Sequence, residues 1–371
     1  MDRNDLRSQS LDLLRFPLAI VVMTIHVWFP GVADATADVP ALNALSGLVA
    51  GLLWDQSVPV YFFISGFVFF LNVDMSAATY RRKLRNRTKS LLIPYIIWNT
   101  LAIAKLLLFA LPCLGFLFAD QRTLADMDLS AGAVAWSYWD ISRGIMHTPL
   151  VTGEIYPIDT PLWFLRDLMI VVVTTPLLHL ALRRARRVTM ALLFAAWAAS
   201  AFFPPGHHSQ LLTAYFFFAW GAGISINGRD IFVEFGRKAR VAAVAYVALS
   251  AAYAVAYCHC AEAMPLLKKA NQCAGLITAY NAAAWLLQRG VCRVNRFLAS
   301  ASFFIYVGHM LVVHEVYMAL VRLTHADPTG GLGSAAAHVL SIPVTTGLLL
   351  GVFYLLRRYT PRLLKVVAGR K

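Results

Sequence analysis

The chain has 371 residues, of which 59% are hydrophobic and only 14% are charged, and its mean hydropathy is +0.63. These values exclude an ordinary soluble globular protein, and the apolar runs are long enough to cross a lipid bilayer. A formal net charge of +14 would suit a nucleic-acid-binding protein, but the placement of the basic residues argues against that class.

We predict an all-α protein with a single integral-membrane domain over residues 1–371, built as a bundle of about ten transmembrane helices. The fifth and sixth of these helices are short for a full crossing. In chain order, the predicted spans are residues 11–29, 46–71, 91–118, 162–182, 188–204, 211–226, 240–258, 272–288, 297–321 and 334–356.

The basic side chains alternate between the two sides of this arrangement. With the N-terminus in the cytoplasm, the segments on the cytoplasmic side hold 25 of the 33 Lys and Arg residues, and the opposite loops hold five. The remaining three, Arg15, Lys105 and Arg166, fall within predicted spans. This pattern follows the positive-inside rule and predicts that both termini are cytoplasmic. Most of the basic excess therefore reflects membrane topology.

The first predicted span carries Arg15 and His26, eleven positions apart in an otherwise almost wholly apolar stretch. At about 100° and 1.5 Å per residue, the two side chains share one helix face and lie roughly 16–17 Å apart along the axis, although Pro17 is expected to kink the helix. A histidine can take a proton from an alcohol, and an arginine can hold an anion or a carbonyl group. The alternative is an arginine that snorkels to the membrane edge and a histidine that pairs with a neighbouring helix.

A second feature is the segment Tyr80–Lys89, YRRKLRNRTK, which holds six cations after the second span. We expect a basic loop at the cytoplasmic face that attracts phosphate groups. Contact with anionic lipid would explain the same charges.

Five sequence motifs resemble the membrane-embedded acyltransferase-3 family. The Arg-x10-His pattern in LDLLR…IHVW is followed by VPVYFFISGFVFF, the basic loop and IPYIIW. PLWFLRDLM at 161–169 and SFFIYVGHM at 302–310 are similar to later signatures of that family. The resemblance covers nearly the whole chain, from about residue 8 to residue 357.

The resemblance implies an O-acyltransferase that takes an acyl group, most commonly acetyl, from cytoplasmic acyl-CoA. The acceptor would be a hydroxyl of a glycan or of a lipid-linked sugar, and no cofactor would be tightly bound. Carried onto this sequence, His26 is the catalytic base, Arg15 is its motif partner, and three arginines hold the CoA phosphates. Those three are Arg82, Arg85 and Arg87. The alternative function is a multi-span transporter or flippase for a glycan or lipid, although the chain shows no internal repeat.

Four other residues are candidates for substrate binding. Asp12 lies three positions before Arg15 and is placed to orient it. Arg166 would bind acceptor, stabilise an oxyanion or pair with a nearby aspartate. Trp163 would stack on a sugar ring or anchor at the membrane interface. His309, in the middle of a span, would relay protons or bond to a neighbouring helix.

The remaining features are weaker signals. Ser65 and Gly66 in FFISGF indicate close helix packing rather than a serine nucleophile. Cys258, Cys260 and Cys273 flank one outer loop, so a disulfide to Cys273 fits an oxidising compartment. The CHC run lacks a fourth ligand, and we predict no metal site. We expect the protein in the cytoplasmic (inner) membrane of a bacterium; the sequence carries no signal for its oligomeric state.

Overall fold

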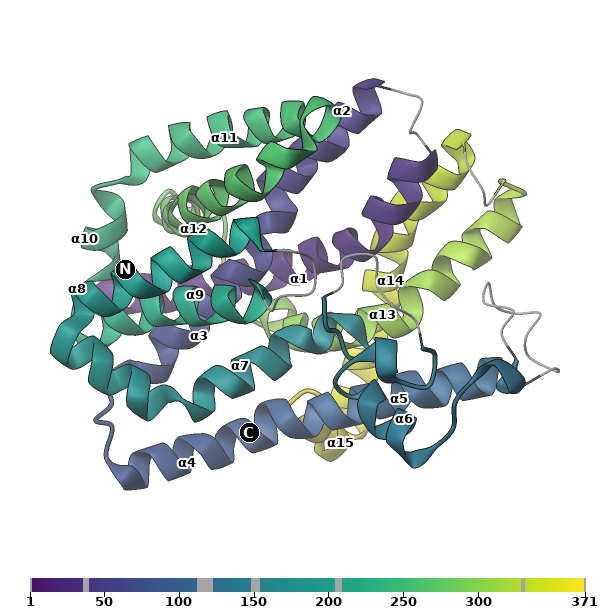
Figure 1. The fold of residues 1–371 in the computed structure, drawn as a ribbon, viewed down its shortest axis with the longest axis horizontal. Helices are drawn as coiled ribbons and strands as arrows, with labels where there is room; N and C mark the ends of the chain where they lie inside the picture. The colour runs from purple at the N-terminus through teal and green to yellow at the C-terminus, as the bar shows by residue number, and fades with distance from the viewer. Residues whose placement is uncertain are drawn as a thin grey trace.

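The computed structural model describes residues 2–35, 40–111, 123–147, 154–203, 209–327 and 331–369. Over these ranges the chain is all-α, as predicted, and contains no β-strand. Long helices run along the longest axis of the molecule (Figure 1). The α-helices are α1 (Arg3–Ala35), α2 (Pro40–Val49), α3 (Asp55–Phe70), α4 (Ala77–Arg87), α5 (Ile93–Phe109), α6 (Ala131–Ser137), α7 (Trp163–Val173), α8 (Thr175–Ala199), α9 (Ser209–Ile226), α10 (Ile231–Gly236), α11 (Ala239–His259), α12 (Met264–Gln288), α13 (Arg296–Thr324), α14 (Gly331–Tyr359) and α15 (Pro361–Val367).

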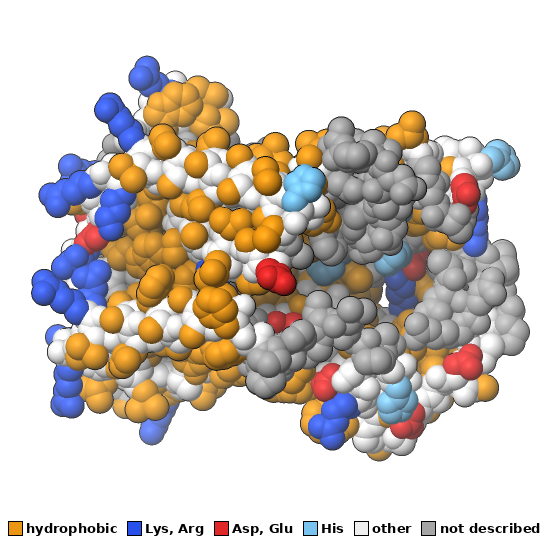
Figure 2. Space-filling model, turned by 45° about the horizontal axis from the view of Figure 1, so that its top comes forward, with side chains coloured by type: hydrophobic (Ala, Val, Ile, Leu, Met, Phe, Trp, Pro, Cys, Tyr) orange, Lys and Arg blue, Asp and Glu red, His pale blue; other side chains and the backbone are white. Residues whose placement is uncertain are grey.

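Six helices in the described ranges are long and apolar enough to cross a membrane, and a bent pair made of α7 and α8 would add a seventh span. Figure 2 shows hydrophobic side chains over the middle of one face and Lys and Arg side chains gathered at the left end. In Figure 1 that end holds α8, α10 and the N-terminus, and we call it the basic end. The protein is an integral membrane protein. The predicted number of ten spans remains a prediction, as does the cytoplasmic location of the termini.

The predicted span 162–182 is not one straight helix. It is broken at Thr174, where α7 ends and α8 begins, and the two helices meet at an angle of 63°. Pro176 in the first turn of α8 cannot donate a backbone hydrogen bond. The hydroxyls of Thr174 and Thr175 donate instead to the carbonyls of Val171 and Val172, at 3.0 and 2.7 Å. A second kink lies at Ala185, within the loop predicted between the fourth and fifth spans.

The basic segment is helical, so the prediction of a loop is wrong. α4 continues through a π-helical turn, η2 (Thr88–Leu92), directly into α5. Ser76 caps α4 by accepting a hydrogen bond from the backbone N–H of Thr79 at 3.3 Å, and the segment from 77 to 92 contains no Gly or Pro to interrupt it. α5 ends at Phe109, and residues 112–118 of the predicted third span lie outside the described residues.

Close packing of α3 on α9 builds the main core. A side chain at Gly66 would collide with the carbonyl oxygen of Phe218, and one at Gly221 would collide with that of Phe63. The two glycines therefore let the helix backbones approach each other, which confirms the packing role predicted for the Ser65–Gly66 pair. α1 lies against α3, α12, α13 and α14, so its side chains face the interior of the bundle.

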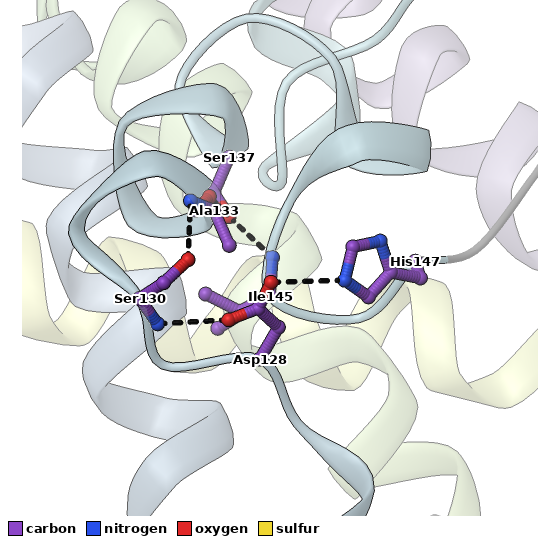
Figure 3. Close-up of polar contacts among 6 residues, drawn as sticks. All are labelled: Asp128, Ser130, Ala133, Ser137, Ile145 and His147. Atoms are coloured by element: carbon purple, nitrogen blue, oxygen red, sulfur yellow. Dashed lines mark hydrogen bonds and ion pairs between the residues drawn. The ribbon is translucent and has the colours of Figure 1, made fainter.

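Short turns around α6 lie at the end opposite to the basic end (Figure 1), and Figure 3 shows the polar contacts that hold them. The Ser137 hydroxyl donates to the Ala133 carbonyl at 3.0 Å and accepts from the Ile145 backbone N–H at 2.9 Å. Asp128 accepts from the Ser130 backbone N–H at 2.9 Å and contacts His147 at 3.3 Å.

Cys258, Cys260 and Cys273, considered above for one disulfide to Cys273, are all free thiols in the structure.

Candidate active site

A cavity of about 580 Å³ opens beside α1. Its volume lies in the range usual for small-ligand sites. Its walls come from four parts of the chain: α1, the end of α4 with η2, the start of α13, and the segment after α15. The lining residues are Asp12, Arg15, Arg87, Ser90, Leu91, Val294, Arg296, Ala299, Ser300, Ser302, Phe303, Ala368 and Gly369.

The cavity is strongly cationic. Arg15, Arg87 and Arg296 reach it from three different helices, whereas Asp12 is the only acidic side chain among the lining residues. Asp12 accepts a hydrogen bond from Nη1 of Arg15 at 2.6 Å and so orients that guanidinium, as the spacing predicted. Within the described part of the chain, the other nitrogens of Arg15 have no hydrogen-bond partner. Three arginines lining a ligand-sized space suit a polyanion such as a pyrophosphate.

Of the three arginines predicted to hold phosphates, only Arg87 lines the cavity. Arg82 and Arg85 are exposed on the flank of α4, and their role remains a prediction. Arg296 was missed because sequence reasoning assigned it to membrane topology. The signal present in the sequence was its position directly after Asn295, which caps α13 and so marks Arg296 as the first residue of a helix.

The structure brings two histidines together in the bundle interior. The rings of His26 on α1 and His309 on α13 lie 5.4 Å apart, centre to centre. His309 is fully buried, and its Nδ1 lies 2.7 Å from the carbonyl oxygen of Tyr306, so this nitrogen carries the proton. Its Nε2 then bears a lone pair and has no partner in the described residues. His26 likewise has no hydrogen bond to any described residue and stays available for proton transfer.

Aromatic side chains connect the level of Arg15 with that of the histidines. The Tyr61 hydroxyl donates to the Arg15 carbonyl at 2.6 Å, and the Tyr61 ring lies 6.3 Å from that of Tyr306. The Tyr306 ring in turn lies 6.3 Å from that of His309. α1 continues as one helix through the predicted kink site at Pro17. Arg15 and His26 are therefore held on one continuous helix, roughly 16–17 Å apart along its axis.

The Arg166 side chain bonds to other groups of the protein. This buried side chain pairs through Nε with Asp167 at 2.8 Å. Its Nη1 donates to the carbonyls of Trp139 and Ile155, each at 3.0 Å. Arg166 thus fastens two parts of the segment before α7, which is the pairing alternative considered for it.

Trp163 lies within the same region, where its ring is 6.2 Å from that of Phe62 and 6.4 Å from that of Tyr156. No group of three His, Cys, Asp or Glu side chains suited to a metal ion occurs among the described residues.

Comparison with known proteins identifies the class of protein. Residues 8–358 match the acyltransferase-3 family model, which is described as an acyltransferase domain. The match covers nearly the whole chain, and the chain therefore belongs to this family of acyltransferases.

The chain is also 24% identical over 372 residues to the succinoglycan biosynthesis protein ExoH of Rhizobium meliloti (strain 1021). The alignment covers 98% of this chain and 92% of that protein. No solved structure matches the chain.

Proposed function

We propose that this protein transfers an acyl group, in the first instance acetyl, from acyl-CoA to a hydroxyl of a glycan or lipid-linked sugar. The observation that carries this proposal is the pairing of two features along α1. A three-arginine cavity lies beside Arg15, and a pair of histidines lies about 16–17 Å away, which is about the reach of an extended pantetheine arm. The phosphates of the donor would bind Arg15, Arg87 and Arg296, and its thioester would reach towards His26.

In the proposed reaction, a ring nitrogen of His26 takes the proton of the acceptor hydroxyl. The acceptor oxygen attacks the thioester carbonyl carbon, and the carbon–sulfur bond breaks as the thiolate leaves with the electron pair. The imidazolium then returns its proton to the thiolate, which gives free CoA and the O-acyl ester. We assign His309 a positioning role, because its unpartnered Nε2 lies on a ring 5.4 Å from that of His26 and is available to accept an N–H of His26 during the reaction.

The name of the relative ExoH supports a polysaccharide or its precursor as the acceptor. The positive-inside rule supports a cytoplasmic location for the basic end, with the donor supplied from that side. A bacterial cytoplasmic membrane fits both of these inferences. Acyl-CoA is a co-substrate in this scheme, and a bound cofactor has no part in it.

The test is acetyl-CoA turnover by purified protein in lipid nanodiscs, measured as release of free thiol. His26→Ala should lower the rate about 10²–10⁴-fold, the usual contribution of a general base. His179→Ala is the matched control, because His179 is also half-buried against an aromatic ring, that of Phe70, and does not line the cavity.

Wild-type turnover in a folded His26→Ala variant would refute the catalytic assignment. Absence of both binding and turnover in the wild type would refute the donor and favour the transporter alternative, since a transporter has no reason to release CoA.

A further inference from the structure

The segment after α14 folds back against the bundle instead of leaving it. α15 packs on α5 and α14, and the side chains of Leu364 and Ala368 are buried. The indole Nε1 of Trp98 on α5 donates to the carbonyl oxygen of Val367 at 2.9 Å. Because this bond joins a side chain to the backbone near the end of α15, it fixes where residues 368 and 369 lie.

Gly369 packs closely on Ser90. Its φ is +60°, in the left-handed region that favours glycine. A Cβ at this position would collide with the carbonyl oxygen of Ser90 and lie 2.9 Å from its carbonyl carbon. Both the backbone conformation and the space therefore require glycine here.

The partner of Gly369 also lies at the cavity. Ser90 belongs to the π-helical turn η2, an irregularity that occurs often at functional sites. Ser90 and Gly369 both line the cavity, as does Ala368. The contact between η2 and the segment after α15 therefore forms part of the cavity wall, next to the end of α4 that supplies Arg87.

We propose that the segment Pro361–Gly369 is part of the donor-binding site, where it forms one wall of the three-arginine cavity and sets the affinity for acyl-CoA. This inference rests on the proposed function, because the donor is acyl-CoA only within that proposal. The segment contributes no group to the chemistry at His26. It acts by shaping the cavity, so its loss should weaken donor binding without slowing the chemical step.

The test compares alanine substitutions at two glycines that both have a positive φ, so that both variants carry the same kind of backbone strain. Gly369→Ala places a methyl group against Ser90, whereas Gly290→Ala, at φ +69°, places it in open space. We expect the Kd for acetyl-CoA, measured by calorimetry in nanodiscs, to rise about tenfold in Gly369→Ala and less than about twofold in Gly290→Ala. The KM for acetyl-CoA should rise in parallel, with kcat within about twofold of the wild type.

Trp98→Phe provides a second, milder variant. It keeps an aromatic ring against Phe304 but removes the hydrogen bond to Val367. We expect its Kd for acetyl-CoA to rise about threefold to tenfold, the usual contribution of one hydrogen bond. This variant decides the question even if Gly369→Ala fails to fold.

The outcomes separate the two proposals. Wild-type affinity in Trp98→Phe and in folded Gly369→Ala overturns the role of the segment and leaves the proposed function standing. A loss of kcat with unchanged KM also overturns it, because a wall of the donor site acts on binding. If the wild-type protein itself does not bind acetyl-CoA, the proposed function fails instead.

Discussion

The geometry of the cavity leads to a specific prediction about which arginines bind the donor. Arg296→Ala removes one of the three arginines that line the cavity, whereas Arg85→Ala removes an exposed cation that does not line it. On α4, Arg85 lies two residues before Arg87, which places it about 200° around the helix. If the donor binds in the cavity, Arg296→Ala should therefore raise the Kd for acetyl-CoA more than Arg85→Ala does, although both substitutions replace arginine by alanine.

The expected magnitude follows from the exposure of Arg296. Two unit charges 4 Å apart attract by about 1 kcal/mol in water and by about 4 kcal/mol at an effective dielectric constant of 20. Because Arg296 is exposed, the lower part of this range applies, and a loss of about 1–2 kcal/mol corresponds to roughly a 5- to 30-fold higher Kd. Arg85→Ala should change the Kd by less than about twofold, since solvent and salt screen a charge outside the cavity.

The assay is calorimetric titration of each variant with acetyl-CoA in nanodiscs, at low and at physiological ionic strength. Arg296→Ala should also weaken the salt dependence of binding, because one charge–charge contact is lost. Equal effects of the two substitutions, or a larger effect of Arg85→Ala, would refute the assignment of the phosphate site to the cavity. The exposed flank of α4 would then be the better candidate.

Two further predictions concern stability. Gly66→Ala forces a methyl group against the Phe218 carbonyl and should lower the free energy of unfolding of the detergent-solubilised protein by about 1–3 kcal/mol. Gly347→Ala, which places its methyl group in open space, should not lower it. Similar melting temperatures for the two variants would contradict the packing argument. For Asp128, the backbone N–H of Ser130 lowers the carboxyl pKa below its ordinary value of 3.8. This group stabilises the folded segment above about pH 4, and the contribution is lost as pH falls through the lower folded pKa. Amide hydrogen exchange over residues 123–147, corrected for its intrinsic pH dependence, should accelerate on acidification in the wild type; an equal acceleration in Asp128→Asn would argue against this carboxyl.

The five sequence motifs predicted the family, and the hydropathy pattern predicted an all-α membrane protein. Both predictions are confirmed, because they depend on local properties of the chain. The shared helix of Arg15 and His26 also follows from sequence, since eleven residues return to nearly the same face of any α-helix. Helix interruptions were harder to predict. The break at Thr174 lies inside an apolar run, and hydropathy does not distinguish a bent helix from a straight one.

What only the tertiary structure decided is which distant segments meet. Local periodicity places His26 and His309 on their own helices, but their contact depends on the packing of α1 against α13. The same holds for the cavity, where Arg87, Arg296 and Gly369 come together from three separate parts of the chain. Helical faces are set by neighbours three and four residues apart, whereas a cavity depends on how whole helices approach one another. The sequence therefore determined the class of protein and the helix that carries Arg15 and His26, and the packing of the bundle decided the composition of the candidate site.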